Sequence, residues 1–238
     1  MNYLKRFIKR IILIFTFLSR IERIETLNFN RRLYAVDQIA QYLVGAKIDG
    51  DYLEFGVYQG TVFTRVYHGL KVHYPKMRFF AFDSFEGLPA PKGIDNIDGF
   101  SSNYHSNEFA CSIEEFKKNL TRNRVNLDRV ELVKGWYNKT LKPNQVGRYG
   151  IKKAALIWID SDLYESAVPV LNFITPYLAE GTVIVFDDWH AFRNNPDRGE
   201  QKACKEWLKK NPKIKLAELF NYGYGGVVFT VISSQNEK

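Results

Sequence analysis

The chain has 238 residues, 45% of them hydrophobic and 25% charged, a profile that suits one domain with a packed core and excludes a largely disordered protein. Its formal net charge is +8, but the first 32 residues carry eight basic and two acidic side chains and supply +6 of that total. Because nucleic-acid binding usually needs a basic surface on the folded domain itself, we expect no nucleic-acid partner.

The first 32 residues are predicted to form a basic amphipathic helix or arm in front of a domain over residues 33–238. Their apolar run, 11–19, is far shorter than the roughly 20 residues of a membrane span, and no small-residue cleavage pattern of a signal peptide follows it. We therefore expect a cytoplasmic protein. The helical apolar stripe and four cations between residues 5 and 10 suit peripheral contact with an anionic membrane surface. Packing of this stripe on the domain or on a second subunit is the alternative, and it stays open.

After residue 50, short apolar runs alternate with longer helical patterns, which is typical of βαβ units and a mainly parallel sheet. The predicted strands are 52–55, 78–82, 130–133, 154–159, 182–186, 215–220 and 226–232. The predicted helices are 33–46, 61–73, 112–123, 165–178 and 198–210. The last two strands are predicted to be an antiparallel pair, joined through Gly223 and Gly225. The sequence thus predicts an α/β fold with a mainly parallel seven-stranded sheet and helices on both faces.

A glycine-containing turn, 54–61, lies directly between the first of these strands and the following helix. Its glycines, Gly56 and Gly60, let the backbone approach a ligand closely, and the helix N-terminus that begins near Thr61 favours a carboxylate. We therefore expect Glu54, Gly56, Tyr58, Gly60 and Thr61 to bind a cofactor. A plain tight turn is the alternative.

Two further positions fit a nucleotide-like cofactor. Asp83 follows the second strand and is placed to accept hydrogen bonds from ribose hydroxyls, together with Ser84 beside it. A helix or loop cap is the alternative for Asp83. Trp136, after the third strand, can cover an adenine ring or belong to the core. The long segment 89–109 is rich in Gly, Asn, Ser and Asp, and loops of this kind are often lids over a site.

Two strands of the predicted sheet run straight into acids. Asp160 and Asp162 follow strand 154–159, and Asp187 and Asp188 follow strand 182–186. Their like charges would repel one another if they converged, and a bound divalent cation removes that conflict. Caps of the following helices would explain one such acid but not all four, so we expect a Mg²⁺ site. His190 is either a base or ligand of this site or a structural residue.

These motifs together resemble the macrocin O-methyltransferase family of sugar O-methyltransferases. The matching stretches run in order from about residue 50 to 210, and Phe-Asp-Ser-Phe-Glu-Gly-Leu-Pro at 82–89 is the most specific. The others are 52–58, 134–137, 159–164 and 187–188. The resemblance implies a Rossmann-like class I methyltransferase that uses S-adenosylmethionine and Mg²⁺ to methylate a sugar hydroxyl of a glycan or glycosylated natural product. It also implies a homo-oligomer.

The resemblance assigns roles to the acids as well. Asp160, Asp187 and Asp188 match the family's metal ligands, and Asp162 matches its proposed general base, for which His190 is the other candidate. A sugar hydroxyl is a poor nucleophile, so it needs a metal to stabilise the developing alkoxide and a group to take its proton. The residues assigned to S-adenosylmethionine are Glu54, Gly56, Tyr58, Gly60, Thr61, Asp83, Ser84, Trp136 and Asp160.

A rival interpretation is a metal-dependent glycosyltransferase, because Asp160-Ser161-Asp162 is also an Asp-x-Asp pattern that could hold a metal and a nucleotide diphosphate. The turn from Glu54 to Gly60 argues against it. A non-catalytic membrane-surface protein is a third class, but it would not need four acids at strand ends.

Overall fold

A single mixed sheet organises the chain in a computed structural model that describes residues 26–96, 105–142 and 147–234. The sheet has the strand order β3-β2-β1-β4-β5-β7-β6. Its strands are β1 (Asp51–Phe55), β2 (Phe79–Asp83), β3 (Val130–Lys134), β4 (Ala154–Ile159), β5 (Val183–Phe186), β6 (Lys215–Tyr222) and β7 (Gly226–Ser233). Strands β1 to β5 pair in parallel, and β7 is antiparallel to both of its neighbours. The predicted seven-stranded sheet and its antiparallel C-terminal pair are confirmed.

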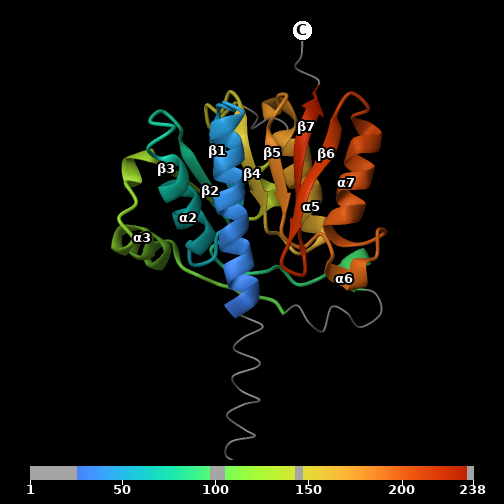
Figure 1. Cartoon of the computed structure of the whole chain (residues 1–238). Helices are drawn as coiled ribbons and strands as arrows, with labels where there is room; N and C mark the ends of the chain where they lie inside the picture. Colours follow the sequence, from blue (N-terminus) through green and yellow to red (C-terminus); the bar gives the residue numbers. More distant parts are fainter. Residues whose placement is uncertain (1–25, 97–104, 143–146, 235–238) are drawn as a thin grey trace, which may run out of the picture.

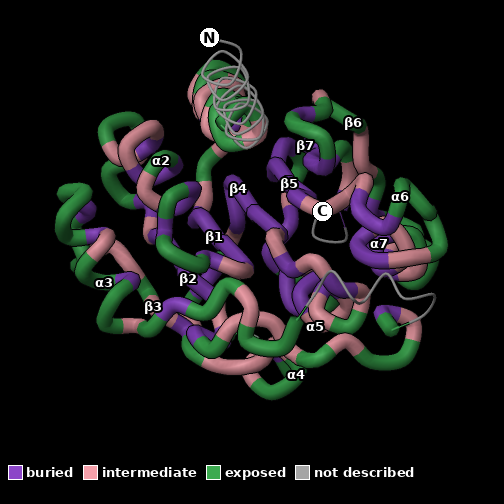
Figure 2. The backbone as a smooth tube through the Cα atoms, turned by 90° about the horizontal axis from the view of Figure 1, so that it is seen from below, coloured by how far each residue is buried: buried purple, intermediate pink, exposed green. Residues whose placement is uncertain are grey.

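Helices cover both faces of this sheet, which explains why its central strands β1, β4 and β5 are buried along their whole length (Figure 2). An N-terminal helix, described over residues 26–45, lies on one face with α2 (Thr61–Leu70) and α3 (Ile113–Arg122). The other face is covered by α5 (Tyr164–Ile174) and α7 (Gly199–Lys210). Two short helices, α4 (Tyr137–Thr140) and α6 (Ala191–Asn194), were not expected from the sequence and lie close to strand ends.

The N-terminal helix lies across its face of the sheet, and its described part begins at the edge where the carboxyl ends of the parallel strands lie (Figure 1). Its buried face, including Val36, Ile39 and Leu43, belongs to the core on that side. The predicted boundary between an arm and the domain, at residues 32 and 33, falls inside this continuous helix. The amphipathic pattern predicted for the start of the chain lies largely in residues 1–25, outside the described residues. In the described part of the chain, no helix is long and apolar enough to cross a membrane.

Strand register brings the predicted site residues to one edge of the sheet. Phe55 of β1 pairs with Ile159 of β4, which in turn pairs with Phe186 of β5. The next residues continue this alignment, because the Asp160 N–H donates to the Phe55 carbonyl and the Asp187 N–H donates to the Ile159 carbonyl, both at 2.9 Å. The turn after β1 and the acids after β4 and β5 therefore lie side by side.

Candidate active site

A cavity of about 1050 Å³ opens at this carboxyl edge. Its size is at the upper end of the range for small-molecule sites, so two ligands can be held together. The predicted site residues that lie in its wall are Glu54, Gly56, Tyr58, Thr61, Asp83, Ser84, Trp136, Asp160, Asp162 and Asp188. Three others, Gly60, Asp187 and His190, are not part of the wall.

The turn after β1 requires glycine for steric reasons. Gly56 has a φ of 88°, and a Cβ on it would lie 1.9 Å from the carbonyl oxygen of Asp160. Gly60, with a φ of 82°, precedes α2, and a Cβ there would lie 2.8 Å from the Phe116 ring. A side chain at either position would therefore push the turn away from its neighbours. Gly60 shapes the turn through its close packing on Phe116 and does not line the cavity, whereas Gly56 also faces the cavity.

Glu54 is buried at the end of β1 and also faces the cavity. The Tyr52 hydroxyl donates a hydrogen bond to its carboxylate. Burial raises the pKa of Glu54 well above its usual range, and the nearby Asp160 adds to this. A ligand with a positively charged group would stabilise the ionised form of Glu54.

Asp83 ties the loops after β1 and β2 together. Its Oδ2 atom accepts hydrogen bonds from the backbone N–H groups of Val57, at 2.8 Å, and Tyr58, at 3.3 Å. Its Oδ1 atom accepts one from Phe85 at 2.7 Å. The loop cap considered from the sequence is thus present, and Asp83 still lies in the cavity wall with Ser84 and Trp136. Burial raises the pKa of Asp83 despite these bonds.

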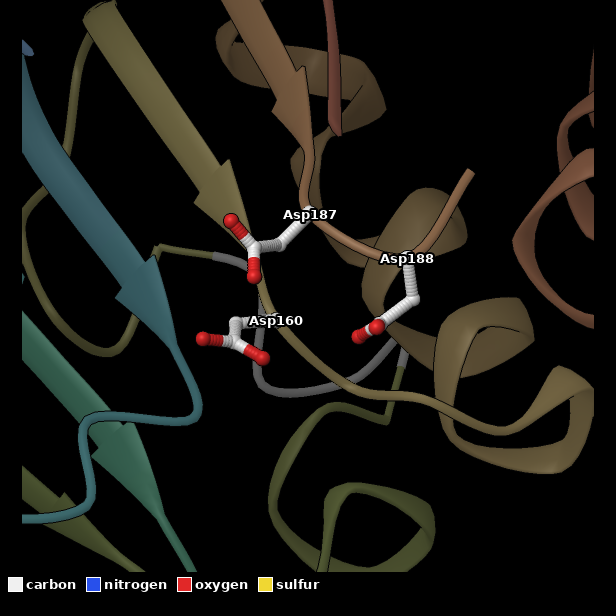
Figure 3. A group of neighbouring side chains, drawn as sticks. All are labelled: Asp160, Asp187 and Asp188. Carbon is white, nitrogen blue, oxygen red and sulfur yellow. The ribbon is translucent and has the colours of Figure 1, made fainter. Parts of the chain in front are cut away.

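Asp160, Asp187 and Asp188 converge as the sequence predicted (Figure 3). Each offers a carboxylate oxygen that lies within 4.8 Å of those of the other two. The Oδ2 atom of Asp188 is buried and finds no hydrogen-bond partner among the described residues. A set of carboxylate oxygens with one unsatisfied member fits a hard divalent cation such as Mg²⁺.

Asp162 lies beside this acidic trio, in the wall of the cavity. Burial, followed by the charges of Asp160 and Asp187, raises the pKa of Asp162 to about 8. Its φ of 56° places its backbone in the left-handed region, which is unusual for a residue other than glycine. Burial and neighbouring charges also raise the pKa values of Asp160 and Asp188 well above normal.

Glu200, in the first turn of α7, is a member of this site that the sequence did not reveal. It is fully buried and accepts hydrogen bonds from the backbone N–H groups of Asp188, at 3.1 Å, and Ser161, at 3.5 Å. Its carboxylate therefore joins the loops that follow β4 and β5. In the sequence it is one of two acids in an amphipathic helix, so nothing marked it as a site residue.

Arg32 of the N-terminal helix also reaches the acids, which the sequence did not predict. Its Nη2 atom donates to Oδ2 of Asp187, and its Nη1 atom lies 3.7 Å from Oδ2 of Asp160. The opposing charges raise the pKa of Arg32 although burial alone would lower it. The other oxygen of Asp187, Oδ1, accepts a hydrogen bond from the Tyr222 hydroxyl. From the sequence, Arg32 was only one cation of the basic terminus.

His190 lies apart from the cavity wall. One ring nitrogen, Nδ1, lies 2.8 Å from the Asn194 side-chain oxygen, and Nε2 lies 3.1 Å from that of Asn221. The residues from Phe192 to Asn194 have φ values of 53° to 57°, a left-handed turn that His190 and Asn194 help to close. This geometry favours the structural interpretation of His190, and a catalytic role stays an untested prediction.

The cavity has a second set of wall residues that comes from distant elements. Phe29 and Leu33 extend from the N-terminal helix, and Tyr224 comes from the turn between β6 and β7. Phe29 and Tyr224 are exposed, at 49% and 71%. Exposed aromatic rings in the wall of a cavity are suited to contact a bound molecule. Neither could be placed from the sequence alone.

Comparison with known proteins identifies the relatives of this chain. The macrocin O-methyltransferase family model matches residues 24–211. A 4'-O-methyltransferase from Streptomyces olivaceus, which acts on 8-demethyl-8-(2,3-dimethoxy-alpha-L-rhamnosyl)-tetracenomycin-C, is 30% identical over 165 residues, 67% of this chain and 60% of the relative. The chain thus spans about 60% of the length of the curated relatives it matches.

Solved structures share the fold. The O-methyltransferase NovP superposes with a TM-score of 0.68 at 23% identity, covering 85% of this chain and 80% of NovP. An O-methyltransferase from Bacillus cereus in complex with SAH superposes with a TM-score of 0.57 at 16% identity, covering 90% and 91%. At these identities the similarity establishes a Rossmann-like α/β fold.

Proposed function

Because the chain belongs to the macrocin O-methyltransferase family, we propose that it transfers a methyl group from S-adenosylmethionine to a hydroxyl group of a sugar-containing acceptor, with Mg²⁺ as a cofactor. The observation that carries the proposal is the cavity at the carboxyl edge, which joins the glycine turn after β1 to the acids after β4 and β5. The named substrate of the Streptomyces olivaceus relative, a rhamnosyl compound, supports an acceptor that is a glycosylated natural product or a glycan.

We assign the methyl donor to the half of the cavity formed by the ends of β1, β2 and β3. Gly56 leaves room for close approach of the donor, and Asp83 and Ser84 are placed for its ribose hydroxyls. Trp136 and the Tyr58 ring can contact its adenine. S-adenosylmethionine supplies an electrophilic methyl group when bound. The negative charge that Glu54 can carry would favour the cationic amino end of the donor.

The acidic half is assigned to the metal and the reacting hydroxyl. Asp160, Asp187 and Asp188 would hold Mg²⁺, which supplies a positive charge that lowers the energy of a developing alkoxide. Asp162 adjoins them in the cavity wall and is not needed as a ligand. We therefore assign Asp162 as the group that accepts the proton of the hydroxyl while its oxygen forms the new bond to carbon.

The acceptor would lie between the N-terminal helix and the turn of β6 and β7. Phe29 and Tyr224 are exposed there, and sugar rings and aglycones present apolar faces that pack on aromatic side chains. Holding the hydroxyl in line with the donor methyl group would be the main contribution of these contacts. The homo-oligomer and the peripheral membrane contact expected from the sequence remain predictions.

Calorimetric titration of the purified protein tests the proposal, with S-adenosylmethionine first and nucleotide sugars second, each with and without Mg²⁺. We expect micromolar binding of the methyl donor alone. Incubation with labelled donor and rhamnosylated natural products should then give a labelled, methylated sugar, and EDTA should stop the reaction. Binding of a nucleotide sugar only, and only with metal, would instead indicate a glycosyltransferase.

A further inference from the structure

The position of Arg32 between two carboxylates is not explained by methyl transfer. Arg32 lies on the N-terminal helix, more than 120 residues in sequence from the acids that it meets. Its guanidinium contacts Oδ2 of Asp187 and approaches Oδ2 of Asp160 to 3.7 Å. Those two residues are members of the trio that would hold the divalent cation. The guanidinium therefore lies beside two of the three carboxylates that a metal would use.

We propose that Arg32 and the divalent cation are alternative occupants of the acid cluster, so that the metal must displace the Arg32 guanidinium in order to bind. This inference rests on the metal site of the proposed function. In the metal-free protein, Arg32 acts as the counter-ion of Asp187. It leaves Asp187 when the divalent cation binds.

The hydrogen bonds of Asp187 support displacement over sharing. The Tyr222 hydroxyl already donates to Oδ1, and Arg32 donates to Oδ2, so both oxygens have a protein donor. The side chain of Asp187 is only 2% exposed, which leaves little room for an additional ligand beside these donors. A divalent ion at Oδ2 would also lie within a few ångströms of a guanidinium charge, and that repulsion is only weakly screened in a buried site.

The Arg32 side chain has room to move away from the acids. Its side chain is 40% exposed and lies in the cavity wall, so rotation about its side-chain bonds can move the charge toward solvent without unfolding the helix. Phe29, about one turn before Arg32 on the same helix, and Leu33, directly after it, line the side of the cavity assigned to the acceptor. Displacement of Arg32 by a metal would thus move a charge next to the surface assigned to the acceptor.

The test compares Mn²⁺ affinity of the full chain and of two variants, measured by electron paramagnetic resonance without methyl donor. Arg32→Met removes the charge and keeps much of the side-chain volume. Arg31→Met removes an exposed charge from the adjacent position of the same helix and is the matched control. We expect Arg32→Met to bind Mn²⁺ roughly tenfold more tightly than wild type, and Arg31→Met to bind like wild type.

Unchanged or weaker Mn²⁺ binding by Arg32→Met would overturn displacement, because Arg32 would then be neutral or helpful to the metal. If wild type and both variants all failed to bind Mn²⁺, the metal site itself would be overturned, and with it the proposed Mg²⁺ dependence, whereas methyl-donor binding would be judged separately by calorimetry. Should Arg32→Met not fold, NMR of the arginine side-chain Nε–H groups of wild type provides a second measurement. Added Mg²⁺ should shift the Arg32 signal toward that of a solvent-exposed arginine, and an unchanged Arg32 signal would overturn the proposal.

Discussion

The two halves of the cavity are built in different ways. At the ends of β1 and β2, the polar groups are satisfied by the chain itself, since Asp83 accepts three backbone hydrogen bonds and Glu54 accepts one from Tyr52. At the ends of β4 and β5, carboxylates crowd together instead. Asp188 keeps a buried oxygen without a partner in the described chain, and a distant arginine supplies the positive charge.

This difference separates a half whose polar groups are hydrogen-bonded within the chain from a half whose carboxylates mainly face one another. Backbone donors cost little to arrange and are present whether or not a cofactor is bound. Several buried carboxylates, by contrast, raise each other's pKa and are stabilised only by a cation. Unfavourable arrangements such as this charge repulsion are commonly concentrated at functional sites. The left-handed backbone at Asp162 adds conformational strain at the same place.

Removal of a carboxylate from the acidic half should reduce methyl transfer more than any other change. Asp160→Ala should abolish the proposed methyl transfer, with a loss of about 10³-fold or more in kcat, because one metal ligand supports several kcal/mol of charge stabilisation. Methyl transfer is measured at saturating donor and Mg²⁺. Asp128→Ala, at an exposed acid before β3, is the control. Near-normal turnover in Asp160→Ala with metal present would remove the metal from the mechanism.

A subtler change separates proton transfer from metal binding. Asp162→Asn keeps the shape of the side chain but cannot accept a proton, so kcat should fall by about 10²- to 10⁴-fold. Affinities for Mn²⁺ and for S-adenosylmethionine should stay within a few-fold of wild type. If His190 were the base instead, His190→Gln would show the large loss and Asp162→Asn would not.

Glu54, at the end of β1, is expected to lower the stability of the fold while it strengthens binding of the methyl donor. Burial raises the pKa of Glu54, so its contribution to folding is most favourable below the unfolded pKa, near 4.3, and is lost as the pH rises above that value. Glu54→Gln should therefore be more stable than wild type by about 1–2 kcal/mol at pH 8, with a smaller difference at pH 5. Its affinity for S-adenosylmethionine should fall roughly tenfold.

Urea unfolding at the two pH values and calorimetry with the donor measure both effects. Tyr52→Phe is a useful companion, because it removes the hydroxyl that donates to Glu54 while leaving the carboxylate in place. Unchanged donor affinity in Glu54→Gln would refute the role assigned to Glu54. Equal stability of Glu54→Gln and wild type at pH 8 would show that the carboxylate is not penalised by burial.

The contrast between the halves also explains what could be read from the sequence. Strand β4 was placed at its observed bounds, and the acids after β4 and β5 converge as predicted, since the carboxyl ends of parallel neighbours share an edge. These inferences depend on local patterns of apolar residues and on one rule of sheet geometry. The turn after β1 could be found for the same reason.

Residues contributed by long-range packing could not be found in this way. Arg32 and Tyr224 reach the site because a helix before the first strand and the hairpin of the last two strands meet at the same edge of the sheet, and no local pattern encodes that meeting. Glu200 lies in a segment with the ordinary pattern of an amphipathic helix, so the sequence does not distinguish it from a surface acid. His190 was judged by its neighbours in sequence, but one of its ring nitrogens contacts Asn194 in the left-handed turn and the other contacts Asn221 of β6, outside the cavity wall.

A milder consequence is expected for a change at the surface that we assign to the acceptor. Tyr224 is 71% exposed in the cavity wall, so its loss should leave folding nearly unchanged. Tyr224→Ala should raise the KM for a glycosylated acceptor by about three- to tenfold, the value of one aromatic contact, while donor affinity stays the same. Tyr34→Ala, which removes a tyrosine 57% exposed outside the cavity wall, controls for surface effects. An equal KM for wild type and Tyr224→Ala would show that the hairpin does not contact the acceptor.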